Sequence, residues 1–337
     1  MKLATYKDGT RDGQLVVVSR DLSTAHYATG IATRMQQALD DWGFIAPQLQ
    51  DLYETLNNGK ARHAFPFDPA MCMAPLPRAF QWVDGSAYLS HVTTVRSALD
   101  IDLPNDTLET DPLMSQGSGD CFVGAQADIH CTNDAMGLDF EAELAVITGD
   151  VPMGASVDDA LEAVRLVVLV NDVSLRMVAK NELPKGLGYV QSKPATAFGP
   201  VAVTLDELGD AWDNGRVRLT VQSTVNGRKV GMCDAGADMA FHFGQLIAHV
   251  SKTRPVRAGA VVGSGAVSNA PIENNGKQEW PKGVSCLIEK RAIEMLLDGK
   301  TSTEYLKPSD SVRIEVKGKD GQSVFGAIDQ TVVGPDV

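Results

Sequence analysis

Hydrophobic and polar residues alternate along a ten-residue stretch in the middle of the chain, LDFEAELAVI, and the alternation predicts a β-strand over residues 138–147. Because successive side chains of a strand point to opposite faces, Phe140 and Leu144 share one face and Glu141 and Glu143 the other. Two carboxylates side by side on an apolar strand repel each other and resist burial. The pattern leaves two interpretations open: a divalent cation between the glutamates, or an exposed edge strand whose glutamates face water.

A second apolar run, residues 166–170, predicts a buried strand that ends in the sequence NDVSLR. Asp172 follows this strand directly and would be a third oxygen ligand. The alternative is an aspartate that caps a turn or helix. Arg176 lies one helical turn further on, if a helix follows, where its guanidinium could bind an anionic group through two hydrogen bonds.

The N-terminal part of the chain predicts a separate small unit. Residues 3–19 have the pattern of a hairpin, with a turn rich in Asp and Gly. Residues 21–58 show apolar positions at helical spacing, and Pro47 is expected to separate two helices. A connector that contains four prolines between residues 66 and 77 follows. We therefore predict a small N-terminal domain over residues 1–75, a hairpin plus helices, and a second domain over residues 76–337.

Composition narrows the function classes. The chain has 337 residues, of which 44% are hydrophobic, and a formal net charge of -13. That charge argues against nucleic acid or an anionic membrane as a partner, and an anionic substrate would need a local positive site. The five cysteines are scattered and form no C-x-x-C pair, which favours reduced thiols. Without an N-terminal apolar segment or a long apolar run, we expect a soluble, cytoplasmic protein.

Four pieces of the sequence together resemble the fumarylacetoacetate hydrolase family: Glu-Ala-Glu, Asn-Asp-Val-Ser-Leu-Arg, Gln191-Ser192-Lys193 and Pro200. The resemblance runs from about Phe80 to near the C-terminus. It implies an α+β fold, with a β-rich mixed β-roll catalytic domain of the fumarylacetoacetase C-terminal type and a small N-terminal domain. It also implies a Mg²⁺ or Ca²⁺ site, a homodimer and cleavage of a carbon–carbon bond in a β-diketo acid.

The resemblance extends the metal site. Family members place an aspartate ligand seven residues before a catalytic histidine, and Asp84 and His91 have this separation. Asp84 would then complete an all-oxygen set with Glu141, Glu143 and Asp172, which suits Mg²⁺, Mn²⁺ or Ca²⁺. The competing interpretation is that Asp84 simply begins an Asp-Gly turn.

The resemblance also implies the catalytic groups. His91 would be the general base, oriented by Glu289, which we expect on a strand over residues 285–289. Lys193, with Arg176, would stabilise the developing oxyanion, and Thr196 would lie near the metal. Without the family, a packing histidine and a surface lysine are the ordinary alternatives.

Three positions depart from the family pattern on the substrate side. Residues 111–120 are expected to form a polar loop in which Ser115 and Gln116 contact substrate, and relatives often have tyrosine where Ser115 stands. They often have glutamine at the position of Ala179. Ala266, in a Gly-rich segment over residues 258–269, replaces a frequent threonine. Because the proposed ligands, His91 and Lys193 are intact, these departures favour changed specificity over lost activity.

The sequence therefore predicts a metal-dependent hydrolase of a small anionic β-diketo acid, such as fumarylacetoacetate or an acylpyruvate, in the catabolism of aromatic compounds. One alternative is a decarboxylase or isomerase of the same family that acts through a metal enolate. The other is a paralogue that binds a metal or ligand without turnover.

Overall fold

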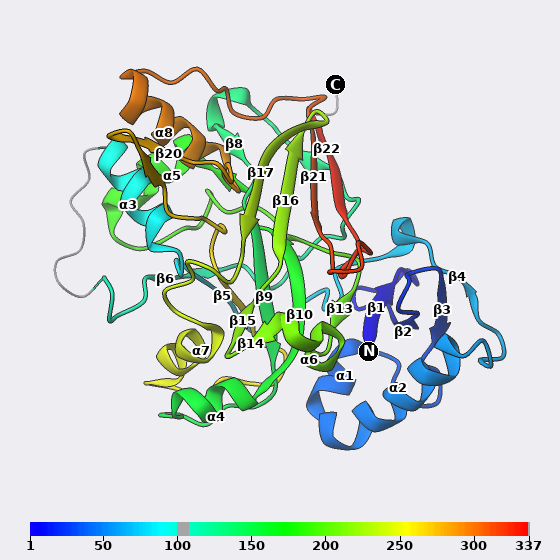
Figure 1. Ribbon diagram of the computed structural model, residues 1–337. Helices are drawn as coiled ribbons and strands as arrows, with labels where there is room; N and C mark the ends of the chain where they lie inside the picture. Colours follow the sequence, from blue (N-terminus) through cyan, green and yellow to red (C-terminus); the bar gives the residue numbers. More distant parts are fainter. Residues whose placement is uncertain (100–107, 336–337) are drawn as a thin grey trace.

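The computed structural model describes residues 1–99 and 108–335, and a large mixed sheet forms its centre (Figure 1). Within those residues the sheet has eleven strands in the order β4-β3-β2-β1-β13-β10-β9-β18-β5-β6, with β12 also paired with β10. The strands are β1 Lys2–Tyr6, β2 Gln14–Val18, β3 Thr24–Tyr27, β4 Phe65–Pro66, β5 Trp82–Gly85, β6 Met114–Gly117, β9 Ala142–Thr148, β10 Val164–Asn171, β12 Ala197–Phe198, β13 Ala202–Val203 and β18 Val261–Gly263.

A second sheet covers one face of the first. Its order is β17-β16-β21-β22-β7. The strands are β7 Ile129–His130, β16 Thr220–Val225, β17 Arg228–Asp234, β21 Ser311–Val316 and β22 Ile328–Val333. Three short pairs complete the strands: β8 Leu138–Asp139 with β11 Ser174–Leu175, β14 Trp212–Asp213 with β15 Arg216–Val217, and β19 Ile272–Asn274 with β20 Lys277–Glu279.

The helices lie around the sheets. They are α1 Met35–Asp40, α2 Trp42–Asn57, α3 Leu89–Ala98, α4 Val157–Glu162, α5 Arg176–Glu182, α6 Leu205–Leu208, α7 Phe243–Ser251 and α8 Leu287–Asp298. Helices α1 and α2 lie beside the N-terminal strands, and α3, α5 and α8 gather at the opposite side of the molecule (Figure 1). None of the helices within the described ranges is long and apolar enough to cross a bilayer.

The alternation of side chains along the central strands divides the interior into two cores. In β10, Val167 and Leu169 pack in the core shared with the second sheet, whereas Val168 and Val170 pack in the core shared with α1 and α2. A strand covered on both faces needs apolar residues at every position. This explains the continuous apolar run that predicted a buried strand here, and it makes β9 and β10 the rigid frame for the residues at their ends.

The N-terminal strands belong to the same large sheet as the rest of the chain. Strand β1 pairs antiparallel with β13, with Lys2 opposite Val203. The predicted hairpin is confirmed as β1 and β2. The helical prediction for residues 21–58 was wrong at its start, because β3 lies there, and Pro47 lies inside α2. Pro47 is accommodated because it and Gly43, whose carbonyl loses its helical donor, are both exposed to water.

Two other local predictions were wrong in ways that affect the site. The supposed loop over residues 111–120 contains β6, which extends the edge of the large sheet. The segment around Glu289 is helical, since Glu289 lies in the first turn of α8. Short apolar segments fit a strand or a helix equally well until their partners are known.

Candidate active site

Glu143 is buried on β9 at the centre of the large sheet, and Glu141, which directly precedes β9, is buried beside it. Their side chains point to the face opposite Phe140 and Leu144, as the alternation predicts. Strand β9 lies between β10 and β18, Glu143 is 0% exposed, and Glu141 is 5% exposed. The interpretation as an exposed edge strand is therefore wrong, and both glutamates need a buried partner.

Three carboxylates from three strands converge beside this strand. Asp84 is on β5, Glu143 is on β9, and Asp172 directly follows β10. One oxygen from each lies within 4.8 Å of the others. Glu143 stands opposite Val170 in the β9–β10 pair, so Asp172 at the end of β10 comes close to it. The structure thus brings together three of the four predicted metal ligands.

Asp84 is held in place by the segment after β18. Strands β5 and β18 run parallel, and the backbone N–H of Gly265 donates to Asp84 Oδ1 at 3.0 Å. Gly265 has a φ of 76°, and a Cβ at this position would lie 2.2 Å from the carbonyl oxygen of Gly85. Only glycine fits there, because it tolerates a positive φ and close backbone approach. The Gly-rich segment therefore serves to orient a carboxylate.

The charges of this carboxylate group are not balanced by the protein. Neither carboxylate oxygen of Glu143 has a hydrogen-bond partner among the described residues. Burial raises the pKa of Glu143 well above its usual value, and the charges of Asp84 and Glu141 add to the rise. Burial, assisted by the charge of Asp172, raises the pKa of Asp84 to about 7. Asp84 and Glu143 are carboxylates without an ion-pair partner among the described residues. Such carboxylates fit a bound divalent cation, which would supply the missing positive charge.

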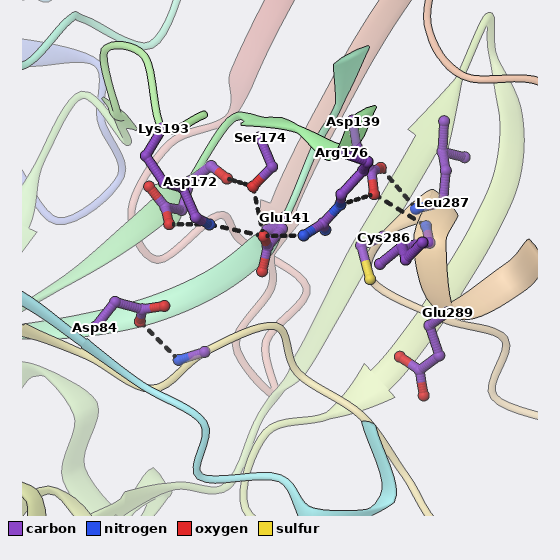
Figure 2. A network of polar contacts seen from close by, with 12 residues as sticks. Asp84, Asp139, Glu141, Asp172, Ser174, Arg176, Lys193, Cys286, Leu287 and Glu289 are labelled. Atoms are coloured by element: carbon purple, nitrogen blue, oxygen red, sulfur yellow. Dashed lines mark hydrogen bonds and ion pairs between the residues drawn. The ribbon is translucent and has the colours of Figure 1, made fainter. Parts of the chain in front are cut away.

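Glu141 differs from this group because cations of the chain surround it. Its Oε1 accepts hydrogen bonds from Ser174 Oγ at 2.6 Å and from Lys193 Nζ at 2.8 Å, and lies 3.0 Å from Arg176 Nη1 (Figure 2). Burial acts to raise the pKa of Glu141, but the charges of Arg176 and Lys193 outweigh it and hold that pKa far below its usual value. Glu141 thus joins the carboxylate group to the two predicted cationic residues.

Lys193 connects Glu141 to Asp172. Its Nζ donates to Asp172 Oδ2 at 2.6 Å, and Thr196 Oγ1 donates to Asp172 Oδ1 at 2.9 Å. The side chain of Lys193 is only 13% exposed, which excludes the alternative of a surface lysine. Thr196 lies beside the carboxylate group, where we expected it.

Asp139 is a part of the network that sequence reasoning missed. Its Oδ2 accepts from Arg176 Nε at 2.8 Å and from the N–H of Ile288 at 2.9 Å, and its Oδ1 accepts from the N–H of Leu287 at 2.7 Å (Figure 2). Asp139 therefore fixes Arg176 and the N-terminus of α8 together. A signal existed in the sequence, because Asp139, Glu141 and Glu143 share one phase of the strand alternation.

His91 and Glu289 form the predicted pair. His91 lies in the first turn of α3, and its Nδ1 is 3.1 Å from Glu289 Oε2. Glu289 Oε1 accepts from Ser268 Oγ at 2.5 Å, which fixes the carboxylate. Burial acts to lower the pKa of His91, but the hydrogen bond and charge of Glu289 outweigh it, so that the pKa is raised. With Nδ1 bound to Glu289, Nε2 is the nitrogen that can accept a proton.

Of the predicted substrate contacts, Ser115 lies on the same face of the sheet as Asp84, and Gln116 does not. Ser115 stands opposite Asp84 in the β5–β6 pair, so both side chains lie on the same face. Gln116 stands opposite Val83 on the other face and is exposed, so the pleat directs it away from Asp84. Ala266 is buried and Ala179 half-buried, and neither offers a polar side-chain atom.

Glu182 is a second residue that sequence reasoning missed. Its carboxylate accepts from the backbone N–H of Gln191 at 2.9 Å and of Ser192 at 3.0 Å, and from Ser192 Oγ at 2.5 Å. The Ser192 hydrogen bond, together with those backbone donors, lowers the pKa of Glu182 to about 2. This cluster closes the loop between α5 and Lys193 and so sets the position of Lys193.

Comparison with known proteins assigns the class. The family model for the fumarylacetoacetate (FAA) hydrolase C-terminal region matches residues 81–333, and the model for fumarylacetoacetase N-terminal domain 2 matches residues 1–78. The chain therefore belongs to the fumarylacetoacetate hydrolase family. The β-rich fold predicted from the resemblance is confirmed, since the fumarylacetoacetate hydrolase of Exiguobacterium antarcticum superposes with a TM-score of 0.64 over 99% of each chain at 19% identity.

Curated relatives of the chain catalyse different reactions. A 2,4-didehydro-3-deoxy-L-rhamnonate hydrolase from Sphingomonas sp. (strain SKA58) is 32% identical over 158 residues, which is 46% of this chain and 51% of that protein. The match thus spans about half the length of that relative. The oxaloacetate tautomerase YisK of Bacillus subtilis (strain 168) is 26% identical over 66% of this chain and 70% of its own. Members of this family are enzymes, and the relatives include both a hydrolase and a tautomerase.

Proposed function

We propose that the chain is a divalent-cation-dependent hydrolase that cleaves a carbon–carbon bond in a small β-diketo acid. The observation that carries the proposal is one continuous polar network. It links the carboxylate group of Asp84, Glu143 and Asp172, through Lys193, Glu141 and Arg176, to the helix that carries Glu289, the partner of His91.

Asp84, Glu143 and Asp172 would hold the cation, and Glu141 is the fourth proposed ligand. A set made only of carboxylate oxygens suits Mg²⁺, with Mn²⁺ and Ca²⁺ as alternatives. When bound, the cation would neutralise these carboxylates and polarise the oxygens of a 1,3-dicarbonyl group.

The residues of the chain supply the proton transfer. Glu289 accepts a hydrogen bond from the Nδ1–H group of His91, so Nε2 presents its lone pair to a water molecule. His91 takes one proton from that water, and the resulting hydroxide attacks a carbonyl carbon of the substrate. The carbon–carbon bond beside this carbonyl then breaks, one product leaves as a carboxylic acid and the other as an enolate, and the His91 imidazolium returns its proton to the enolate carbon. Ser268 keeps Glu289 oriented, and the Glu289 carboxylate stabilises the imidazolium that forms.

Lys193 and Arg176 recognise and stabilise negative charge. Arg176 is held on two sides by Asp139 and Glu141, and its Nη2 is buried without a hydrogen-bond partner in the part of the chain that the structure describes. That N–H group is available to a substrate carboxylate or to the oxyanion. In a chain of net charge -13, these two residues supply the local positive charge that an anionic substrate requires.

The test is a turnover assay in H₂¹⁸O and, separately, in D₂O. Fumarylacetoacetate and a series of acylpyruvates are offered with Mg²⁺ and with EDTA, and β-diketone absorbance is followed. We expect Mg²⁺-dependent loss of absorbance with ¹⁸O in a carboxylate product. His91→Gln should reduce it by roughly 10²–10⁴-fold, and His130→Gln is the matched control, since His130 is an exposed histidine on β7. Absence of cleavage for every compound would overturn the proposal.

A tautomerase is the second candidate, supported by the match to the oxaloacetate tautomerase over 66% of this chain. The same base would move a proton between carbon and oxygen of a keto acid without activating water. Deuterium exchange at the substrate carbon without cleavage would identify this reaction. Saturable binding with neither exchange nor cleavage would instead identify a non-catalytic paralogue.

Two further proposals rest on the family alone. We propose a homodimer, to be tested by sedimentation at micromolar concentration, where a monomer would contradict it. We also propose a cytoplasmic role in the catabolism of aromatic compounds, for which growth of a deletion strain on such compounds is the test.

A further inference from the structure

We propose that His91, Cys286 and Glu289 form a second metal site, selective for a thiophilic divalent cation such as Zn²⁺, and that occupation of this site inhibits the enzyme. The inhibition rests on the proposed role of His91 as the base, whereas the binding does not. The site lies at the junction of α3 and α8 and shares no residue with the carboxylate group of Asp84, Glu143 and Asp172.

The spacing of the three side chains fits a tetrahedral ion. His91 Nδ1 lies 3.1 Å from Glu289 Oε2 and 3.8 Å from Cys286 Sγ, and the three ligand atoms all lie within 4.8 Å of one another. Tetrahedral Zn²⁺, with its usual bond lengths to nitrogen, oxygen and sulfur, separates such pairs by about 3.3 Å and about 3.5 Å. The two distances from His91 Nδ1 therefore differ from the tetrahedral values by only a few tenths of an ångström.

The ligand types of this second site disfavour the hard cations that we propose for the site of Asp84, Glu143 and Asp172. A thiolate and an imidazole favour zinc and related metals over Mg²⁺ or Ca²⁺. Cys286 is 0% exposed and is the N-cap residue of α8. Burial, with the negative charges of Asp139 and Glu289, raises the pKa of its thiol well above the usual value, so the thiol keeps its proton until a metal ion displaces it. Glu289 is 1% exposed and the His91 side chain 18%, so the imidazole marks the route of entry.

Metal binding would remove the base by fixing its tautomer. In the metal-free enzyme, Nδ1 of the neutral imidazole carries the proton and donates to Glu289, and Nε2 accepts a proton from water. A cation on Nδ1 requires the lone pair there, so the single imidazole proton must reside on Nε2, which then cannot accept another. Cys286 releases its thiol proton to solvent as the S–metal bond forms. No oxidant or reductant takes part.

Cobalt(II) reports the site directly, because a thiolate ligand gives it an intense charge-transfer absorption and carboxylates do not. We would titrate Co²⁺ into the full-length protein with Mg²⁺ in excess, compare wild type with Cys286→Ser and Cys286→Ala, and then displace Co²⁺ with Zn²⁺. Cys72→Ser is the matched control, since Cys72 is another buried thiol and is not part of the proposed site. Melting temperatures would verify that each variant is folded.

We expect one equivalent of the thiolate–cobalt band in wild type and Cys72→Ser, and none in either Cys286 variant. Loss of the thiolate should weaken zinc inhibition roughly 100-fold, about the share of a zinc-binding free energy that one ligand contributes, with Mg²⁺-dependent turnover retained. The band alone supports the metal site even if no substrate is turned over. A band that persists in both Cys286 variants would overturn the site, and a band in wild type without zinc inhibition would overturn the inhibitory role.

Discussion

The two ends of the buried polar network differ in how their charges are balanced. Around Arg176, the guanidinium lies between Asp139 and Glu141, and backbone N–H groups of α8 satisfy Asp139 further. Around Glu143, three carboxylates converge, and among the described residues Lys193, which donates to Asp172, brings the positive charge. At the first end the charges are paired within the chain, and Arg176 Nη2 is left to donate to a ligand. The second is unbalanced, and buried charge that a protein leaves unbalanced marks a place for a ligand.

The largest effect should come from Glu143→Gln, which breaks the unbalanced end. We expect Mg²⁺ affinity to fall by at least roughly 100-fold, because one charged oxygen beside Mg²⁺ contributes several kcal/mol even in a screened site. Calorimetry measures this change, with exposed Glu273→Gln as the control. Without metal the same variant should melt above wild type, since folding no longer has to bury and neutralise a carboxylate whose pKa burial raises. Equal Mg²⁺ affinity in the variant would contradict the assignment.

His91→Ala should come next, with turnover reduced by roughly 10²–10⁴-fold, the usual contribution of a general base. Mg²⁺ affinity should not change, because the proposed ligands are carboxylates. Since Glu289 raises the pKa of His91, activity should fall on acidification at a pH above the ordinary histidine value of about 6.5. Glu289→Gln removes that effect and should move the acidic limb to lower pH. A stable, active His91→Ala would exclude this base.

Asp139→Asn tests the balanced end. The amide retains the size of the side chain but removes one of the two negative partners of Arg176 and one of the acceptors at α8. We expect kcat/KM to fall roughly 10–100-fold, as for other groups that orient the residues around a metal, and stability to fall by about 1–3 kcal/mol. Steady-state kinetics and chemical denaturation measure the two. Because Asp139 acts through Arg176, the loss should exceed that of Asp329→Asn, an exposed partner of Arg313.

Glu182→Gln should have the smallest effect. Glu182 organises the loop before Lys193 and does not itself enter the network, so we expect KM to rise a few-fold with kcat almost unchanged. Its pKa of about 2 means that the carboxylate stays ionised throughout an ordinary pH profile, so the variant should not move the acidic limb. A kcat loss as large as that of His91→Ala would show instead that Lys193 depends entirely on this loop.

Some of this site follows from the sequence alone. Strand alternation places Glu141 and Glu143 on one face opposite Phe140 and Leu144, and the apolar run before Asp172 requires a strand that delivers it from the core. These inferences succeed because strand periodicity is local and holds whatever lies next to the strand. The family resemblance, carried by a few short motifs, then supplied Asp84, His91 and Glu289 from segments that no periodicity connects.

The tertiary structure decided how these charges are shared. Only the pairing of β9 with β10 and β18 buries both glutamates, and only the position of α8 brings Asp139 to Arg176 and Cys286 to His91. These contacts join residues at least sixteen positions apart, and more than thirty apart for every contact other than the β9–β10 pairing, so no short sequence window contains both partners. The sequence alone could thus establish which faces carry carboxylates, and packing established which of those carboxylates the chain neutralises and which it leaves for a cation.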